Sequence, residues 1–263
     1  MRETIPVTDP DDPRIADYRA VRERDLVGRE GRFVIEGEVV LRLAARRGRF
    51  PLVSALLSEK RAALAEVLPD DVPVYVAGQP VMDAIAGFPI HRGVLAIGRR
   101  GEAPDPAALL AGLPPRAVVV ALIGLTNHDN VGGIFRNAAA FGAQAVLLDS
   151  ETCDPLYRKA IRVSAGGALV VPFARAGDPP ALIATLEEAG FTPLALSPRG
   201  AFTLASLRRP DRVALLLGAE GPGLPEEVLA RARTVRIPMA GDFDSLNVAV
   251  TSGIALHALA GPG

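Results

Sequence analysis

Two polar residues, Asn130 and Arg136, are the first candidates for chemistry, because they lie in the small, apolar stretch 127–143 (NHDNVGGIFRNAAAFGA). The spacing of the apolar residues predicts a helix here. Within it, Gly132 and Gly133 would let another backbone or a ligand approach closely. An arginine in such a helix needs a partner or a functional role. A helix capped by Asn130, with Arg136 in a structural ion pair, explains the pattern equally well.

A glycine-rich turn holds the next candidate, Glu220. In 215–224 (LLLGAEGPGL), an apolar strand-like run enters a turn with three glycines in six residues. Such a turn exposes main-chain donors and acceptors with little side-chain bulk, which suits a cofactor whose adenine lies against the backbone. The glycines are spaced G-x-x-G-x-G, unlike the G-x-G-x-x-G of dinucleotide-binding domains. A plain turn fits the segment equally well.

The last candidates, Ser245 and Asn247, lie at the start of the final predicted helix. In 235–259 (VRIPMAGDFDSLNVAVTSGIALHAL), the pattern predicts a short strand, a proline-led loop and a helix with Ser245 as its N-cap. Unpaired N–H groups face outward at such a helix start. Ser245 can be a simple cap, and that role does not exclude a functional one. The helix is apolar almost all round, which predicts that it is buried.

Several other catalytic centres are not indicated by the sequence. It has no G-x-x-x-x-G-K-[ST], no G-x-S-x-G and no H-E-x-x-H. The histidines, His91, His128 and His257, are far apart and are interpreted as structural or solvent-exposed. The single cysteine, Cys153, has no metal-ligand partner nearby, so we expect neither a metal site nor an intramolecular disulfide.

The composition predicts a soluble, cytoplasmic protein. Apolar residues make up 49% of the 263, but no run is long enough to span a membrane, and the N-terminus lacks a signal-peptide core. The net charge of −1 argues against a strongly basic nucleic-acid binder. Nearly all cations are arginines, which suit bidentate contact with phosphate. Acidic residues interleave with them, so solvated helix faces explain the arginines equally well.

Strand-like and helix-like stretches alternate on both sides of a proline-rich segment. Residues 99–116 (RRGEAPDPAALLAGLPPR) carry four prolines and interrupt the periodic pattern. We therefore expect a smaller α/β domain in 1–100, a linker in 101–115 and a second domain in 116–263. Strict alternation in the second domain predicts a parallel sheet covered on both faces.

The predicted strands are 33–35, 53–57, 74–76 and 94–97 before the linker, and 117–125, 145–149, 170–173, 191–197, 213–217 and 235–237 after it. The predicted helices after the linker are 130–141, 156–164, 180–189, 225–233 and 245–259.

Taken together, the three candidate segments closely resemble the signature motifs of the SpoU family, within the SPOUT class of RNA methyltransferases. The resemblance covers 116–263, with the motifs in the family's order and spacing, and 154–167 (DPLYRKAIRVSAGG) resembles the family's intervening segment. The pattern FVIEGEVVL, LLSEK, VPVYV and HRGVLAIGRR in the first hundred residues resembles, more loosely, the RNA-binding domain that many members carry.

The resemblance implies a fold, a cofactor and partners. The fold is a parallel sheet whose C-terminal segment is threaded through a loop as a deep trefoil knot. Knots are rare exceptions among proteins. Members are homodimers with the active site at or near the dimer interface. The implied reaction is attack of a ribose 2'-hydroxyl of tRNA or rRNA on the methyl group of S-adenosylmethionine, with no metal.

The resemblance also assigns residues. The cofactor is expected against Leu196, Leu217, Gly218, Ile237, Met239, Leu246 and Asn247. The catalytic candidates are Asn130, Arg136, Glu220, Ser245 and Asn247. Because a guanidinium stays protonated at neutral pH, Arg136 is expected to hold the adjacent phosphate and to stabilise developing alkoxide charge rather than act as a base. Glu220 and Asn130 are expected to orient the loops, and Ser245 and Asn247 to fix Arg136 or the ribose.

One position departs from the family pattern, and alternatives remain. Many members have an Asp-Pro pair where this sequence has Asn127 and His128. A non-catalytic RNA-binding member of the same fold is the main alternative. A Rossmann-type oxidoreductase would need G-x-G-x-x-G after the first strand, where NHDNVGG stands instead. The methyltransferase interpretation requires that the turn around Glu220 and the start of the last helix form a single pocket facing Arg136.

Overall fold

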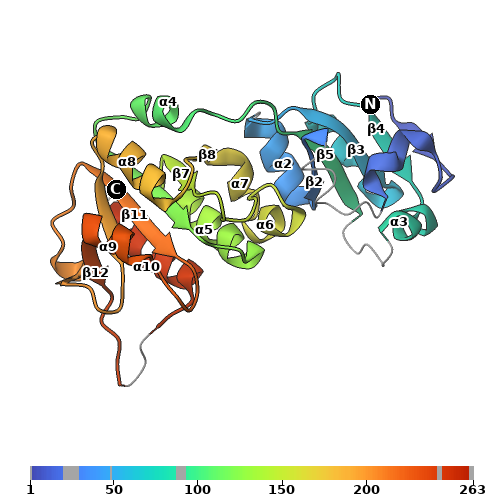
Figure 1. The fold of residues 1–263 in the computed structure, drawn as a ribbon. Coiled ribbons are helices and arrows are strands. Elements are labelled where there is room, and N and C mark those ends of the chain that lie inside the picture. Colours follow the sequence, from blue (N-terminus) through green and yellow to red (C-terminus); the bar gives the residue numbers. More distant parts are fainter. Residues whose placement is uncertain (1, 20–29, 48, 87–92, 242–244, 261–263) are drawn as a thin grey trace. The chain divides into compact units, whose positions relative to one another are not determined.

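The computed structural model describes residues 2–19, 30–47, 49–86, 93–241 and 245–260. By their contacts, the residues divide into two compact units (Figure 1). The first comprises Met1–Glu102 with Leu156–Val170, and the second comprises Ala103–Pro155 with Val171–Gly263. The segment Leu156–Val170, which the sequence pattern placed in the second domain, therefore groups with the first unit.

The second unit is built on a seven-stranded sheet in the order β10-β12-β9-β11-β6-β7-β8. Every pairing between these strands is parallel, which confirms the predicted sheet. The strands are β6 Ala117–Ile123, β7 Ala145–Leu148, β8 Phe173–Arg175, β9 Thr192–Leu196, β10 Phe202–Thr203, β11 Arg212–Gly218 and β12 Arg233–Arg236. All of β6 is buried, as expected for an apolar run in the middle of a covered sheet.

Helices cover both faces of this sheet. Because side chains alternate along a strand, Ala117, Val119, Ala121 and Ile123 point to one face, where they share a core with α4, α8 and α9. These helices are α4 Pro106–Ala111, α8 Pro179–Glu188 and α9 Glu226–Arg231. On the other face, α5 His128–Ala140 and α10 Val248–Ala260 lie side by side (Figure 1).

Three predicted elements differ from the structure. The predicted strand 170–173 is wrong: α7 Gly167–Val170 precedes it and β8 starts only at Phe173. A short apolar run cannot distinguish a buried helical turn from a strand. The helix predicted to start at 156 starts at α6 Arg158–Val163. Within the predicted linker, Asp105 accepts a hydrogen bond from Ala108 N at 2.8 Å and so caps α4.

The first unit is a smaller α/β layer with a five-stranded sheet in the order β1-β4-β3-β5-β2. Strand β5 runs antiparallel to both its neighbours, and the other pairings are parallel. Its strands are β1 Ile5–Val7, β2 Arg32–Glu36, β3 Leu52–Ser58, β4 Val74–Ala77 and β5 Val94–Arg99. Its helices are η1 Pro13–Tyr18, α2 Glu38–Arg47, η3 Glu59–Val67 and α3 Gln79–Ala86, with α6 and α7. The four predicted strands are present, and the three-residue β1 was missed.

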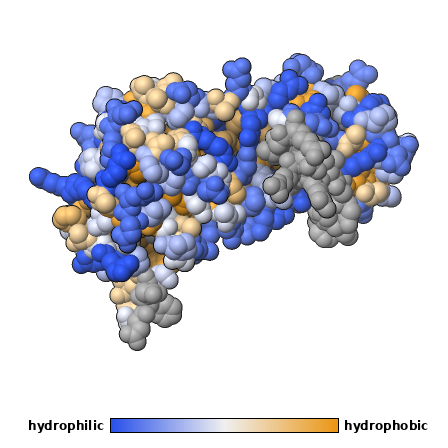
Figure 2. All heavy atoms as spheres, in the orientation of Figure 1, coloured by the Kyte–Doolittle hydropathy of each residue, from blue (hydrophilic) through white to orange (hydrophobic). Residues whose placement is uncertain are grey.

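Hydrophilic side chains predominate on the face in Figure 2, with hydrophobic side chains in smaller patches between them. Among the described helices, none has both the length and the apolar character needed to cross a bilayer.

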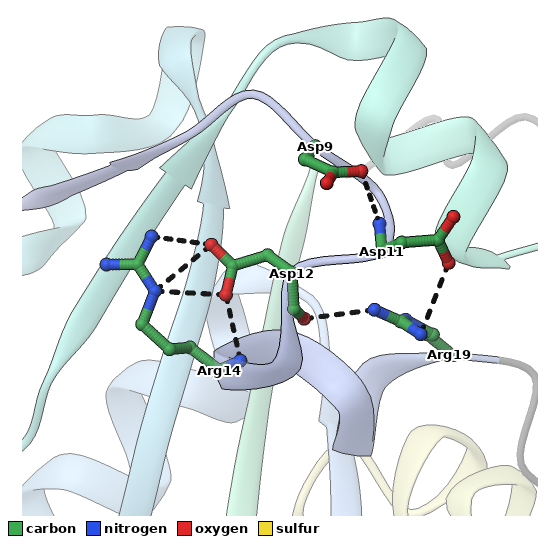
Figure 3. Close-up of polar contacts among 5 residues, drawn as sticks. All are labelled: Asp9, Asp11, Asp12, Arg14 and Arg19. Carbon is green, nitrogen blue, oxygen red and sulfur yellow. Dashed lines mark hydrogen bonds and ion pairs between the residues drawn. The ribbon is translucent and has the colours of Figure 1, made fainter.

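A polar cluster ties the start of the chain to η1 (Figure 3). The carboxylate of Asp12 accepts hydrogen bonds from the backbone and side chain of Arg14, and its carbonyl accepts one from Arg19 at 3.0 Å. Arg19 also pairs with Asp11 at 3.2 Å. The hydrogen bonds from Arg14 lower the pKa of Asp12 from 3.8 to about 2.

This lowered pKa predicts a pH-dependent stability. Because the pKa of Asp12 is lower in the folded than in the unfolded chain, its contribution is complete above pH 4 and is lost as the pH falls towards 2. Asp12→Asn should therefore slightly lower the melting temperature at pH 7, and the gap to the wild type should close between pH 4 and 2. Asp71→Asn, at an exposed aspartate, is the control. A gap independent of pH would contradict the assignment.

Candidate functional site

A cavity of about 510 Å³ lies where three neighbouring strands of the second unit end. It is lined by residues 196–198 at the end of β9, by 217–221 and 223–224 at the end of β11 and in the turn after it, and by Val235, Ile237 and Met239 in and after β12. Residues 245–248 and Thr251 complete the wall. The volume lies within the range of roughly 300–1,000 Å³ found for small-molecule sites. Its place at the carboxyl ends of parallel strands is the usual place for a ligand in an α/β sheet.

All seven residues predicted to contact a cofactor line this one cavity. They are Leu196, Leu217, Gly218, Ile237, Met239, Leu246 and Asn247. Two of the predicted catalytic residues, Glu220 and Ser245, line it as well. The expected pocket between the glycine turn and the start of the last helix is therefore present, and cofactor contact by these residues stays a prediction.

The glycines after β11 let the chain fold back on itself to make a wall of the cavity. A Cβ atom at Gly218 would lie 2.4 Å from the carbonyl carbon of Gly223, so only glycine fits. Gly221 and Gly223 have φ values of +89° and +74°, which glycine adopts readily. Gly223 N donates to Ala219 O at 3.0 Å and closes the turn. The wall is thus largely backbone.

Asn247, rather than Ser245, caps the last helix. The helix α10 starts at Val248, and the Asn247 Oδ1 accepts hydrogen bonds from Ala249 N at 2.9 Å and Val250 N at 3.3 Å. The prediction of Ser245 as N-cap was wrong because serine and asparagine are about equally good caps, so residue type does not decide between nearby positions.

The same Asn247 side chain joins the three candidate segments. Its Nδ2 donates to Asn130 Oδ1 at 2.9 Å and to Glu220 Oε1 at 3.0 Å. An amide nitrogen has two hydrogens, so both bonds can form together. Asn130 is only 6% exposed. It does not cap α5, since Asn127 Oδ1 accepts the hydrogen bond from Asp129 N at 2.8 Å.

The close packing of α5 on α10 depends on small and amide side chains. A Cβ at Gly133 would lie 2.7 Å from that of Ala249, so the predicted close approach at this glycine is confirmed. Asn137 Nδ2 donates to Ala249 O at 2.7 Å and to Ser252 Oγ at 2.9 Å. These contacts fix α5 and the first turns of α10 relative to each other.

A buried carboxylate that the sequence analysis missed, Asp149, fixes the turn before α5. It is 1% exposed and accepts hydrogen bonds from Gly124 N, Thr152 N and Thr152 Oγ1 at 2.7–2.8 Å. Cys153 N donates to Leu125 O at 2.8 Å and holds the same turn. The signal that could have identified Asp149 in the sequence is an aspartate at the end of a predicted buried strand.

Arg136 lies apart from this network. Its side chain is exposed, it is not among the residues that line the cavity, and within the described residues it makes no hydrogen bond or ion pair. The expected pocket therefore does not face Arg136 within a single chain. Asn247 was expected to fix Arg136 or the ribose, and in the single chain it contacts Asn130 and Glu220 rather than Arg136. The contact with the ribose stays a prediction.

The remaining candidates show no sign of a second catalytic centre. Burial raises the pKa of the Cys153 thiol to about 11, so the thiol is protonated at neutral pH. His257 packs edge-on against Phe141, with ring centroids 5.6 Å apart. His91 lies outside the described residues. Within the described ranges, no three His, Cys, Asp or Glu side chains are grouped to hold a metal ion.

Comparison with known proteins gives consistent matches. Residues 117–257 match the model of the SpoU rRNA Methylase family. The chain is 42% identical over 267 residues to a Mycobacterium bovis protein named as a tRNA/rRNA methyltransferase, covering 95% of this chain and 90% of the relative. It is 29% identical over 228 residues to the 23S rRNA (guanosine-2'-O-)-methyltransferase RlmB of Salmonella typhi, covering 85% and 86%. The AdoMet-bound rRNA methyltransferase from Sinorhizobium meliloti has a similar fold, with a TM-score of 0.83, 26% identity and 97% coverage of both chains.

The contacts of Asn247 predict a specific loss of stability. Asn247→Ser keeps a good helix cap but removes both donors, which leaves the buried Asn130 oxygen without its partner. We expect the free energy of unfolding to fall by about 1–3 kcal/mol in urea titrations. Asn127→Ser is the matched control, because it keeps a cap and breaks no link between segments. Equal losses in the two variants would show that the link contributes nothing.

Proposed function

Because the chain belongs to the SpoU family of RNA methyltransferases, we propose that it transfers a methyl group from S-adenosylmethionine to a ribose 2'-hydroxyl of tRNA or ribosomal RNA. The observation that carries this proposal is the cavity in which all seven predicted cofactor residues meet, beside the contact of Asn247 with Asn130 and Glu220. This arrangement joins a ligand site to the polar residues that the reaction requires.

The cavity fits S-adenosylmethionine in size and chemistry. Apolar side chains of Leu217, Ile237 and Leu246 offer faces for an adenine ring, and the glycine turn offers main-chain donors and acceptors. Gly218 keeps this wall free of side chain. When bound, the cofactor supplies an electrophilic methyl group.

The residues of the chain have two tasks in this reaction. They hold the ribose hydroxyl in line with the methyl group, and they stabilise negative charge as the hydroxyl loses its proton. Asn130 and Glu220, held by Asn247, orient the loops, and Ser245 on the cavity wall contacts the ribose. Arg136 binds the adjacent phosphate through its unpaired guanidinium and stabilises the developing alkoxide.

The working form is proposed to be a homodimer built on the outer face of α5 and α10. The expected burial of α10 holds for only part of the helix in the single chain, since Val250 is 54% and Ile254 is 41% exposed. These residues are one turn apart and form an apolar stripe that a second copy would cover. On α5, Arg136, Ala139 and Ala140 are exposed as well. Such a dimer places Arg136 near the interface.

Three parts of the chain are proposed to divide the work, with 1–100 binding RNA, 101–115 linking and 116–263 catalysing transfer. The arginine-rich α2 and the sheet of the first unit support an RNA-binding role. We also propose that the C-terminal segment is threaded as a deep trefoil knot. In support, β12 follows β11 in the chain but pairs with the earlier strand β9, and α10, which follows β12, packs against α5.

The proposal is tested by incubating the protein with S-adenosylmethionine carrying a labelled methyl group and with rRNA or tRNA from a strain that lacks this chain. Nuclease digestion and mass spectrometry should find the label on a 2'-O-methylated nucleoside. Substrate with a 2'-deoxy nucleotide at the modified position should accept no label. Cofactor and RNA binding without any methyl transfer would instead support the non-catalytic alternative.

Arg136→Ala should separate turnover from cofactor binding. We expect the rate of methyl transfer to fall by roughly a hundredfold or more, because charge stabilisation in the transition state is lost. The affinity for S-adenosylmethionine, measured by calorimetry, should stay unchanged, since Arg136 does not line the cavity. Arg231→Ala, which removes an exposed ion pair with Glu187 and a hydrogen bond to Pro180 O away from the cavity, is the control. Full activity in Arg136→Ala would refute the role.

The proposed interface predicts the oligomeric state. Val250→Asp combined with Ile254→Asp places charges on the apolar stripe and should convert a dimer into a monomer in sedimentation experiments. Val39→Asp, at an apolar residue of α2 that is 71% exposed, is the matched control and should leave the dimer intact. A dimer that persists in the double variant would place the interface elsewhere.

A further inference from the structure

An aromatic residue among arginines lies on the edge of the sheet beside the cavity. Phe202 in β10 is 47% exposed and is the aromatic residue among the exposed large apolar side chains of the described chain. The guanidinium of Arg233 lies over its ring, 5.5 Å from the centroid. Arg199 and Arg236 flank it in the chain and in the paired strand. We call these four residues the edge platform.

The fold holds this edge tightly. Phe202 lies opposite Val235 in the parallel pairing of β10 with β12. A Cβ at Gly200 would lie 2.4 Å from the carbonyl carbon of Val235, so the approach of the two segments requires glycine. Arg236 donates to Gly200 O at 2.6 Å and bridges the segments. The ring is therefore presented from a fixed backbone.

The platform shares its chain segments with the cavity. Residues 196–198 line the cavity and lead directly into Arg199 and β10. Val235, the register partner of Phe202, lines it too. Because paired strands lie about 4.8 Å apart, the ring is within reach of nucleotides that flank one bound at the cavity.

The charge of the platform is not neutralised. Arg199 and Arg233 are exposed, and among the described residues neither is paired with a carboxylate. Arg231, close by on α9, differs because it pairs with Glu187 on α8. A single ring between unpaired cations matches a nucleobase with its phosphates, whereas protein partners are typically bound by wider apolar areas.

We propose that the edge platform binds a single-stranded segment of the RNA substrate, with a base stacked on Phe202 and the flanking phosphates on Arg199 and Arg233. The proposal rests on the proposed RNA methyltransferase function. Stacking on aromatic side chains, with arginine at the phosphates, is the common way to hold unpaired RNA. The platform is then a substrate-positioning surface outside the cofactor cavity.

The stacking step is tested with Phe202→Ala, with Phe202→Trp as the variant that keeps an aromatic face. Phe202→Ala should raise the KM for rRNA and weaken binding of a fluorescein-labelled oligouridine by roughly fivefold or more. The kcat at saturating RNA and the affinity for S-adenosylmethionine should not change, and Phe202→Trp should bind RNA as the wild type does. Unchanged RNA binding in Phe202→Ala, or an equal loss of cofactor affinity, would overturn the proposal.

The phosphate contacts are tested by the salt dependence of oligouridine binding. Arg199→Gln and Arg233→Gln should each reduce the slope of log affinity against log salt by about 0.7, as expected for one lost phosphate contact on a single strand. Arg231→Gln should leave the slope unchanged. Slopes equal to the wild type in the first two variants would overturn the phosphate contacts.

The oligouridine assay needs no methyl transfer, so the two proposals can fail separately. If the wild type binds oligouridine through Phe202 but never methylates RNA, the proposed function fails and the platform stands. If RNA is methylated with the same KM in Phe202→Ala and the wild type, the platform fails and the proposed function stands.

Discussion

The architecture of the site depends on one amide side chain. Asn247 caps α10 with its oxygen and reaches Asn130 and Glu220 with its nitrogen. Each hydrogen bond contributes only about 1 kcal/mol, which is small beside the burial of the sheet. Its importance is geometric, because Asn130 in α5 and Glu220 in the turn after β11 are 117 and 27 residues away from Asn247 in sequence.

The parallel sheet makes this contact possible. In a parallel sheet, all strands end at the same edge, so the loops after β6, β9, β11 and β12 meet there. Close approach then requires positions without side chains, which Gly218 and Gly133 supply. Asp149 fixes the turn that brings α5 to this edge. The hydrogen bonds of Asn247 therefore depend on the packing of the buried strands, which brings the three segments together.

The sequence predicted the sheet well because its strands are buried on both faces. The apolar side chains of the run 117–125 can be buried on both faces of the strand only between two layers of helices, and β6 lies between such layers. Very short elements carried too little pattern, so β1 and β10 were missed and β8 was misplaced. Periodicity also cannot distinguish Ser245 from Asn247 as the cap of α10.

The residues of the site were predicted by motif, but their orientations were not. The motifs identified Asn130, Glu220 and Asn247 as catalytic candidates, and hydrogen bonds join these three residues in the structure. The outward direction of Arg136 depends on which face of α5 packs against α10, and that is decided by Gly133 and its neighbour in space. Similarly, the apolar sequence of α10 does not reveal that one stripe of the helix stays exposed in the single chain. Both properties arise from tertiary packing.

The separation of the cavity from the cations reconciles RNA binding with a net charge of −1. None of the described residues that line the cavity is an arginine or a lysine, and one of them is Glu220. The arginines proposed to bind a substrate phosphate therefore lie outside the cavity, on α5 and along the sheet edge. Affinity for phosphate depends on local charge within about 8 Å at physiological salt, beyond which charges are screened. A few unpaired arginines on α5 and along the sheet edge are therefore enough for the proposed RNA contacts, although acidic residues elsewhere cancel the total charge.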